Sequence, residues 1–574
     1  METEVFENIK LERLIEKEFG DKVNIFTDKF RNVIEGTVKD YNRSFEIGSF
    51  LHKKGVKQIV NNLNYPGQKK TEPHRFNIED KTLDNLKPDI LIIGGGVIGC
   101  NALYDLSKYN LDILLIEKEE DVSMGQSSRN DGCIHVGFDL KSDSNKLKYL
   151  LRAREILPNL LENLGIDYDF NGQTVGFKSN KYKYAYPLLK LKAIKNHVPG
   201  GIKFLSKKKL KEIEPNISDE IKCGLHFPKG GIFSPYLFTI ALAEVAIKNG
   251  AKISFKTIAE SMEVKDGKII SVKTNRGTIY PKVVINAAGV FSDEIAKMAN
   301  DQTFTIHPRQ GTDLIFDNNQ TKNLSRTAIT IYGSSSKNTK HTKGGGVMPT
   351  IDGNILVGPD AIEIENKEDY AVPRSSIDNI LAKHKQTMKK LDRNGVIAYF
   401  SGTRAATYEE DFEIRKGIYT KNIVHAGGIQ SPGLTCAPSI AEDLTKFSLE
   451  ILGNVKLKKT YLTKREKPIE IRKLSYEERD KLIKENPKYG HIICRCEEIS
   501  EGEILDALSS PLHPTSVDSI KRRVRAGMGR CQGGFCQMHI VKMISDFYNI
   551  KIEDVNKKGE GRIIYKDLKE KSDE

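Results

Sequence analysis

"DILIIGGGVIG", residues 89–99, decides the fold, because a continuous apolar run leads directly into a glycine-rich turn. The next ten residues, "CNALYDLSKY" (100–109), have the pattern of a helix. They are followed by "LDILLIEKEE" (111–120), which has the pattern of a second buried strand. Together these segments predict a strand, helix, strand unit of about 30 residues in a parallel sheet that is covered on both faces.

The glycines of this turn predict a dinucleotide site. Gly94, Gly96 and Gly99 form G-x-G-x-x-G, and Glu117 ends the next strand. In this pattern the first glycine makes the tight turn, the second lets backbone N–H groups approach a pyrophosphate, and the third lets the helix pack on the strand. Glu117 can accept a hydrogen bond from a ribose 2′-OH, which disfavours NADP and leaves NAD and FAD.

Two later segments favour FAD. "SMGQSSRNDGCIHVGFD" (123–139) is a loop of small residues that could wrap a pyrophosphate and a ribityl chain. "IVHAGGIQSPGLTCAPSIAEDLTKF" (423–447) predicts a strand, a turn and a helix that begins near Gly433, Leu434 and Thr435. The N-terminus of such a helix would stabilise negative charge on a reduced flavin, although a plain strand-helix unit is the alternative interpretation.

Length and composition indicate a soluble chain of several domains. A chain of 574 residues predicts two to four domains of about 100 to 200 residues each. No window approaches about 18 uninterrupted apolar residues, and the start is acidic, so we expect a cytoplasmic protein whose membrane contact is at most peripheral. The lysines behind the net charge of +13 are scattered, and no nucleic-acid partner is therefore expected.

The first 87 residues predict a small α+β module and a linker. Residues 5–19 have helical spacing, and "VIEGTVKDYNRSFEIGSFLHKKGVKQIVNNL" (33–63) has the pattern of strand, helix and strand. This pattern resembles the BON domain, which is thought to bind ligands or membranes. Residues 65–87 combine proline, glycine and charges without periodicity, as linkers do.

Beyond this module the sequence divides into four further regions. Residues 88–455 form the main body, and the basic, proline-marked segment 456–488 is a predicted linker. Residues 489–550 hold a cysteine-rich domain, and 551–574 are a charged tail.

The main body resembles the D-amino-acid-oxidase-like FAD oxidoreductases, and within them the glycerol-3-phosphate dehydrogenases of the anaerobic type. The matching segments include "IIGGGVIG", "SSRNDGCIHVGFD", "VVINAAGVFSDEIA", "IHPRQG", "SGTRAATYEEDFEI" and "GGIQSPGLT", in the family's order across more than 350 residues. The resemblance implies an α/β fold: a FAD-binding Rossmann-like domain interleaved with a mixed α+β substrate domain. To this the sequence adds the small N-terminal module and a small helical [2Fe-2S] domain.

The resemblance also implies roles for individual residues. The substrate face would draw on His135, Arg309, Lys343 and Arg404, where His135 could take a proton and the arginines could bind a phosphate or carboxylate. A proline often follows the arginine of the family's motif, whereas this chain has "TRAAT", and Asp131 replaces a small or neutral residue. The residues that would hold FAD are Gly94, Gly96, Gly99, Glu117, Ser127, Ser128, Gly289, Gly428, Ile429, Gly433, Leu434 and Thr435.

The cysteines fall into two groups. Cys100, Cys133, Cys223 and Cys436 are spread through the body and are expected to be small buried residues.

The other four, Cys494, Cys496, Cys531 and Cys536, are close in sequence and offer four thiolates to [2Fe-2S] or zinc. The C-x-C spacing is cramped for one tetrahedral ion, and free reduced thiols are a third alternative. "ICRCEEIS" and "RRVRAGMGRCQGGFC" resemble the bacterioferritin-associated-ferredoxin-like [2Fe-2S] domain, which favours the cluster. We expect the basic run 521–530 to counter the cluster's charge or to attract an acidic electron partner; an ordinary solvated basic face is the alternative.

These features lead to one leading hypothesis and two alternatives. A FAD and [2Fe-2S] dehydrogenase would oxidise sn-glycerol 3-phosphate, a small anionic substrate, to dihydroxyacetone phosphate and pass electrons to a protein or quinone acceptor. The first alternative is the same chemistry on L-2-hydroxyglutarate or another 2-hydroxy acid. The second is a non-catalytic electron-transfer subunit.

Overall fold

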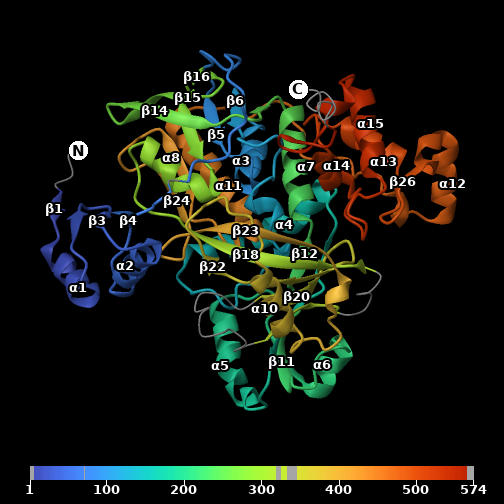
Figure 1. Ribbon diagram of the computed structural model, residues 1–574, viewed down its shortest axis with the longest axis horizontal. Helices are drawn as coiled ribbons and strands as arrows, with labels where there is room; N and C mark the ends of the chain where they lie inside the picture. Colours follow the sequence, from blue (N-terminus) through green and yellow to red (C-terminus); the bar gives the residue numbers. More distant parts are fainter. Residues whose placement is uncertain (1–4, 70, 319–324, 332–344, 565–574) are drawn as a thin grey trace, which may run out of the picture.

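The computed structural model describes residues 5–69, 71–318, 325–331 and 345–564. Figure 1 shows two β-sheet layers at the centre, a small N-terminal module on one side and a C-terminal domain on the other. The first layer is the predicted parallel sheet, in the order β13-β6-β5-β17-β25, with β24 added antiparallel at the edge. Its strands are β5 (Ile90–Ile93), β6 (Ile113–Ile116), β13 (Lys252–Ser254), β17 (Val283–Asn286), β24 (Glu413–Lys416) and β25 (Ile423–Gly427).

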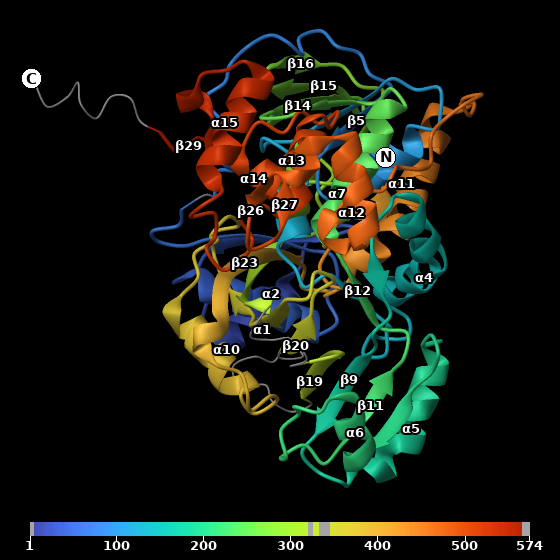
Figure 2. The ribbon, with the colours of Figure 1, turned by 90° about the vertical axis from the view of Figure 1, so that its right-hand side faces the viewer.

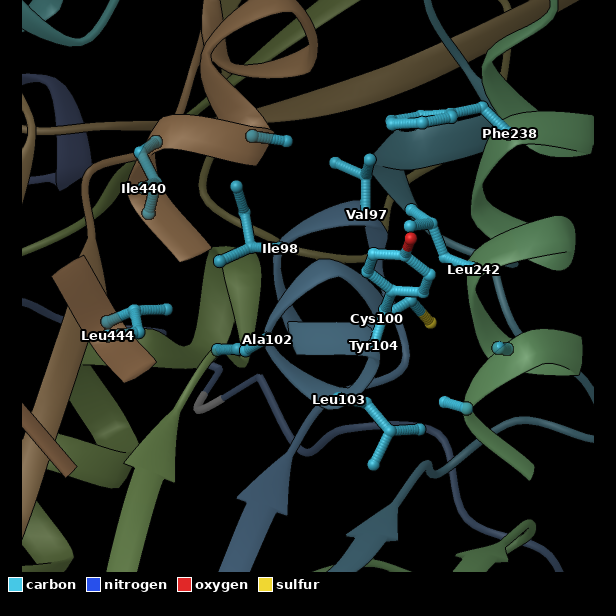
Figure 3. Close-up of a cluster of buried hydrophobic side chains, with 14 of the residues drawn as sticks. Val97, Ile98, Cys100, Ala102, Leu103, Tyr104, Phe238, Leu242, Ile440 and Leu444 are labelled. Carbon is cyan, nitrogen blue, oxygen red and sulfur yellow. The ribbon is translucent and has the colours of Figure 1, made fainter. Parts of the chain in front are cut away.

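Both faces of this sheet are buried, as its apolar strands predict. On one face, helix α3 (Val97–Leu106) lies between α7 (Pro235–Lys248) and α11 (Gly433–Leu452), and Figure 3 shows its side chains packing toward both neighbours. Helix α4 (Asn145–Asn163) packs against α11. The opposite face is covered by α8 (Ser292–Met298) and by the small sheet β14 (Ala259–Lys265), β15 (Lys268–Thr274) and β16 (Gly277–Ile279).

The second layer is a mixed sheet with the order β10-β11-β9-β19-β20-β21-β18-β22, in which β23 pairs with β18. Helices α6 (Lys207–Ile213) and α10 (Arg374–His384) cover it, and α5 (Tyr182–Lys195) packs at one end. A separate small sheet is formed by β7 (Cys133–Ile134), β12 (Gly231–Phe233) and β8 (Tyr168–Asp169). The strands of the second layer are β9 (Gln173–Phe177), β10 (Lys203–Ser206), β11 (Cys223–Phe227), β18 (His307–Phe316), β19 (Ala328–Ile331), β20 (Gly346–Pro349), β21 (Ile355–Gly358), β22 (Ile362–Glu363) and β23 (Val396–Ala406).

The N-terminal module is the predicted α+β unit. Its elements are β1 (Phe6–Glu7), α1 (Ile9–Phe19), β2 (Val23–Thr27), β3 (Asn32–Thr37), α2 (Tyr41–Lys53) and β4 (Ile59–Asn64), with β3 and β4 parallel. Its core is completed from outside by Tyr408, which follows β23 and is buried among the module's apolar residues. Asn61 donates a hydrogen bond to the Tyr408 hydroxyl at 2.8 Å, and Gly48 leaves room for the ring, since a Cβ there would lie 2.3 Å from Tyr408 Cζ.

The C-terminal domain is mostly helical and is larger than predicted. It contains β26 (Ile492–Cys494), β27 (Ile499–Ser500), α13 (Glu501–Leu508), α14 (Val517–Val524), α15 (Gln537–Tyr548), β28 (Asn556–Lys558) and β29 (Gly561–Arg562). Val555, expected in a charged tail, is fully buried in this domain's core because the end of the chain folds back on it. The expected linker 456–488 contains helix α12 (Tyr476–Glu485), whose Ser475 and Glu478 form a capping box.

Buried ion pairs fix the C-terminal domain to the first layer. Asp121, in the loop after β6, accepts hydrogen bonds from Arg522 and Arg523 of α14, and all three side chains are buried. Figure 2 shows α14 beside α7, and Tyr236 of α7 contacts Met528 of the domain. Burial would raise the pKa of Asp121, but the charges of Arg523 and Arg522 outweigh it and hold that pKa below its ordinary value. None of the described helices is long and apolar enough to cross a bilayer.

Candidate active site

A cavity of about 710 Å³ runs from the β5–α3 turn to the paired strands β18 and β23. Its walls come from both layers, as well as from the 123–139 loop and the start of α11. The carboxyl ends of β5 and β6 therefore open into it, which is where sheets of this type bind ligands.

The glycine turn has the shape that a pyrophosphate requires. Gly94 has a φ of +111°, and a Cβ there would lie 2.4 Å from the Ala287 carbonyl oxygen. A Cβ on Gly99 would overlap the Gly94 carbonyl oxygen, so glycine is needed for α3 to pack against the turn. Gly96 lines the cavity at the start of α3, where the helix presents its N–H groups.

Glu117 closes this end of the cavity. Its carboxylate accepts hydrogen bonds from the backbone N–H groups of Gly95 and Glu119, at 2.5 and 2.9 Å. Burial raises the pKa of Glu117, while the charge of Lys118 opposes that rise. The side chain is thereby fixed at the end of β6, the position from which a ribose hydroxyl is read in dinucleotide sites.

The 123–139 loop is fastened to both helices that flank the cavity. Ser127 Oγ accepts a hydrogen bond from the N–H of Val97 at 2.8 Å, at the start of α3. Thr435 Oγ1 accepts from the N–H of His135 at 3.2 Å and donates to the Cys133 carbonyl oxygen at 3.0 Å, which ties the loop to α11. His135 Nε2 lies 3.0 Å from Ser431 Oγ, and both side chains line the cavity.

The predicted cofactor residues fall into two sets. One set supports the walls without lining the cavity: Gly99, Ser128, Gly428 and the buried Thr435. Gly428 has a φ of +66° in the turn before α11. The other set lines the cavity: Gly94, Gly96, Glu117, Ser127, Gly289, Ile429, Gly433 and Leu434.

Arg404 lies on the opposite wall. β18 and β23 are antiparallel with Arg309 opposite Arg404, so the two side chains share a face. Arg404 is partly exposed to the cavity and lies across Gly311, where a Cβ would be 2.4 Å from its Nη2. In the described part of the chain its acceptors are two backbone oxygens, those of Gln310 at 3.4 Å and Asp360 at 3.3 Å.

Arg309 lines the same cavity but is already engaged. It is buried and forms ion pairs with Glu363 and Glu410, the latter at 2.6 Å. Burial would raise the pKa of Glu410, but the hydrogen bond and charge of Arg309 outweigh it and hold that pKa at about 2. Glu410 also accepts a hydrogen bond from Gln430 at 2.7 Å, so Arg309 stabilises the wall as well as facing the cavity. Lys343, the fourth predicted substrate residue, lies outside the described residues.

The structure adds a group that the sequence did not single out. Asp313 on β18 lines the cavity, and its buried Oδ1 has no hydrogen-bond partner among the described residues. Burial, and then the negative charge of Asp131, raise the pKa of Asp313 well above its ordinary value, although Arg404 opposes them. In the sequence it is one of several polar residues in its strand, and only the pairing of β18 with β23 places it beside Arg404.

The four C-terminal cysteines meet as two pairs. Cys496 Sγ lies 3.5 Å from Cys531 Sγ, and a hydrogen bond from Cys536, the largest effect, lowers the pKa of Cys494 to about 6. Among the described residues, only Asp131, Cys133 and His135 form a set of three potential metal ligands whose ligand atoms all lie within 4.8 Å of one another. No three of the four C-terminal sulfur atoms are therefore that close together.

This spacing fits two metal atoms better than one. A single zinc ion with Zn–S bonds of about 2.3 Å would hold all four sulfurs within about 4 Å of one another. The surroundings also suit thiolate ligands. Glycine at position 529 leaves space for Cys496 Sγ, since a Cβ there would lie 2.7 Å from that sulfur. Backbone N–H groups donate hydrogen bonds to the sulfur atoms of Cys494 and Cys531. The scattered Cys100, Cys133, Cys223 and Cys436 are buried, as expected.

Three arginines of the basic run next to these cysteines pair with acidic groups of this chain. Arg522 and Arg523 are buried against Asp121, and Arg525 pairs with Asp352 and Glu497. The expectation of a basic face for an acidic partner is therefore wrong for these three arginines, because acidic groups distant in sequence bind them. Arg530 is half exposed and pairs with Asp317.

Comparison with known proteins agrees with both sites. Residues 89–447 match the FAD dependent oxidoreductase family, and residues 492–546 match the BFD-like [2Fe-2S] binding domain. The chain is 36% identical over 477 residues to the glycerol 3-phosphate dehydrogenase of Caloramator mitchellensis, which covers 83% of this chain and 98% of that protein.

Two more distant relatives match large parts of the chain. One subunit of the anaerobic glycerol-3-phosphate dehydrogenase of Escherichia coli K12 is 22% identical over 507 residues, covering 81% of this chain and 90% of the relative. The FAD-bound structure of dithionite reduced L-α-glycerophosphate oxidase from Mycoplasma pneumoniae superposes with a TM-score of 0.61 and 28% identity, covering 66% of this chain and 98% of that one. The chain therefore belongs to the FAD dependent oxidoreductases, binds FAD, and carries a BFD-like [2Fe-2S] domain.

Proposed function

We propose that this chain oxidises sn-glycerol 3-phosphate to dihydroxyacetone phosphate and passes the electrons to a separate acceptor. The relatives named above are dehydrogenases or oxidases of glycerol phosphate by their names. The observation that carries the proposal is Arg404, a guanidinium that faces the cavity and has only backbone oxygens as acceptors in the described part of the chain. A small phosphate ester is the kind of anion such a group binds through two N–H donors.

The neighbouring residues suit this substrate. Burial favours the neutral acid of Asp313, so it adds no negative charge beside Arg404 and is able to donate a hydrogen bond to a substrate oxygen. Oxidation of the secondary alcohol removes a hydride from carbon and a proton from oxygen. We assign that proton to His135, which lines the cavity and is oriented by Ser431 and by the link to Thr435.

FAD, when bound, supplies the two-electron oxidant, and a [2Fe-2S] cluster supplies a one-electron carrier. The chain's contribution is to hold the cysteine domain rigidly against the cavity-bearing domain, through Asp121 and its two arginines. The cysteine site is accessible from solvent, because Cys496 and Phe535, next to Cys536, are both exposed. A protein acceptor is therefore the proposed partner.

The test is an anaerobic visible spectrum of the holoenzyme before and after addition of sn-glycerol 3-phosphate. Flavin bleaching with partial loss of the cluster bands is expected. Arg404→Ala should raise the substrate concentration needed for half-maximal bleaching by about 10- to 100-fold, because hydrogen bonds to a charged group are lost. Arg374→Ala, whose side chain is exposed on α10, is the matched control and should behave as the wild type.

Other outcomes would point to the alternatives. Bleaching by L-2-hydroxyglutarate but not by sn-glycerol 3-phosphate would redirect the assignment to 2-hydroxy acids, since a carboxylate also suits Arg404. A fully flavinated protein that neither substrate reduces would contradict the enzymatic proposal and favour an electron-transfer subunit.

A further inference from the structure

Helix α5 has two apolar stripes on opposite sides. Tyr182, Tyr186, Leu189 and Ala193 pack into the core beneath β9 and β11. At 3.6 residues per turn, the second stripe is centred about 180° away from the first. It consists of Tyr184, Leu188, Leu191 and Ile194.

The second stripe is not used by the described fold. Tyr184 is 75% exposed, Leu188 71%, and Leu191 and Ile194 62% each. Single exposed apolar residues are ordinary, but four on successive turns of one helix form a continuous patch that indicates an interaction surface. Figures 1 and 2 show α5 at the lower end of the molecule, away from the C-terminal domain, where no described element lies over its outer side.

The positive charge around this patch indicates what kind of surface it binds. Within α5 there are four lysines and no acidic residue: Lys183, Lys190, Lys192 and Lys195. By helical geometry, Lys183 and Lys190 lie on one flank of the exposed stripe and Lys192 on the other. Lys195 continues the stripe itself. The nearby helix α6 starts with three more lysines at the same end of the molecule.

An apolar stripe with lysines on both flanks fits a partner that is apolar in its interior and negatively charged at its surface. A second copy of this helix would bring lysines against lysines, which disfavours self-association through this face. A bilayer with anionic headgroups satisfies both features, since leucine and tyrosine side chains enter the headgroup and acyl boundary while lysine amines remain at the phosphates.

We propose that α5 docks this protein on an anionic phospholipid bilayer, with its axis in the plane of the membrane surface. This assignment is independent of the proposed substrate. The sequence left open a membrane contact that is at most peripheral, and the proposal names the element, the residues and the lipid charge for such a contact. No residue of α5 lines the cavity, and the exposed stripe faces away from the core that borders it, so docking through this stripe is expected to leave the oxidation site unchanged.

The test is co-sedimentation of the full-length holoenzyme with vesicles. Binding is expected to phosphatidylcholine vesicles containing about 30% phosphatidylglycerol, and far less to pure phosphatidylcholine. Leu188→Gln combined with Leu191→Gln should lower the partition coefficient at least about tenfold, because two side chains lose their apolar burial. Lys190→Gln combined with Lys192→Gln should remove most of the preference for the anionic lipid.

Controls separate this proposal from its competitors. Tyr476→Gln removes an apolar side chain that is 84% exposed on α12, and it should bind vesicles as the wild type does. All variants should retain the visible spectrum and the substrate-dependent bleaching of the wild type. Failure of the wild type to bind anionic vesicles would overturn the proposal, as would equal binding by the leucine variant. A leucine variant that changed only the oligomeric state in gel filtration would overturn it in favour of a second copy.

Discussion

Replacing Asp121 with asparagine should loosen the C-terminal domain from the rest of the enzyme. Asp121 is 1% exposed and accepts from Arg522 at 3.0 Å and from Arg523 at 2.7 and 3.2 Å. Asparagine keeps the volume but leaves two buried guanidinium groups without their shared counter-charge. Among the residues that the structure describes, their remaining acceptors are the backbone oxygens of Val122 and Ser519 and, for Arg522, the carboxylate of Asp518.

Breaking a buried ion pair by removing one partner costs about 3–5 kcal/mol, since an uncompensated charge stays in the interior. The cost should appear as opening of the docked interface. At 1.36 kcal/mol per factor of ten, hydrogen exchange of the backbone amides in α14 and in the 119–123 loop should accelerate by about 10²- to 10³-fold or more. Transfer of electrons from flavin to cluster should slow in the same variant.

Two companion variants sharpen this test. Asp112→Asn removes an exposed partner of Lys252 and should cost at most about 1 kcal/mol. Arg523→Gln in the Asp121→Asn background removes one unpaired charge and should recover part of the protection. If exchange in α14 changes no more in Asp121→Asn than in Asp112→Asn, the ion pairs do not hold the domain and the reasoning fails.

Three further outcomes follow from the two sites. Gly94→Ala should lower the affinity for FAD by about tenfold or more, measured by flavin fluorescence during dilution, because its Cβ would strike the Ala287 carbonyl oxygen; unchanged affinity would show that the turn relaxes. Cys496→Ser should release most of the bound iron while flavin absorbance is retained, and an iron-replete variant would contradict the assigned ligand. Because Arg309 depresses the pKa of Glu410 to about 2, this carboxylate should stabilise the fold above its ordinary pKa of about 4.3, and the stabilisation should be lost as pH falls toward 2. Glu410→Gln should flatten that part of the pH profile of unfolding, and an unaltered profile would rule out the contribution.

The sequence was sufficient where structure depends on local spacing. Gly94, Gly99 and Glu117 sit within one strand, helix, strand unit, so their spacing alone predicts a turn and a carboxylate at the end of the next strand. The gathering of the four C-terminal thiols could likewise be anticipated from their closeness in sequence, whereas the pairing of Cys496 with Cys531, 35 residues apart, could not.

Contacts between distant segments could not be predicted in this way. From the sequence, Arg522 and Arg523 were interpreted as part of a basic surface. Asp121, which lies 401 residues before Arg522 in the chain, comes into contact with them only in the folded protein. Arg309 was expected to bind substrate, whereas the fold surrounds it with Glu363 and Glu410. Such pairings depend on which strands become neighbours, and the spacing of residues within one strand carries no signal of them.

The burial of Tyr408 within the N-terminal module couples that module mechanically to the cavity wall. Two positions after Tyr408 the chain reaches Glu410 of the cavity wall, and His307, which contacts both Tyr408 and Phe45 of the module, bonds to Glu363. The module therefore supports the cavity wall from behind. A substitution in its core would act on that wall through Tyr408 and His307. Substitutions in the core of the module are therefore expected to alter the cavity wall, although hundreds of residues separate the two in sequence.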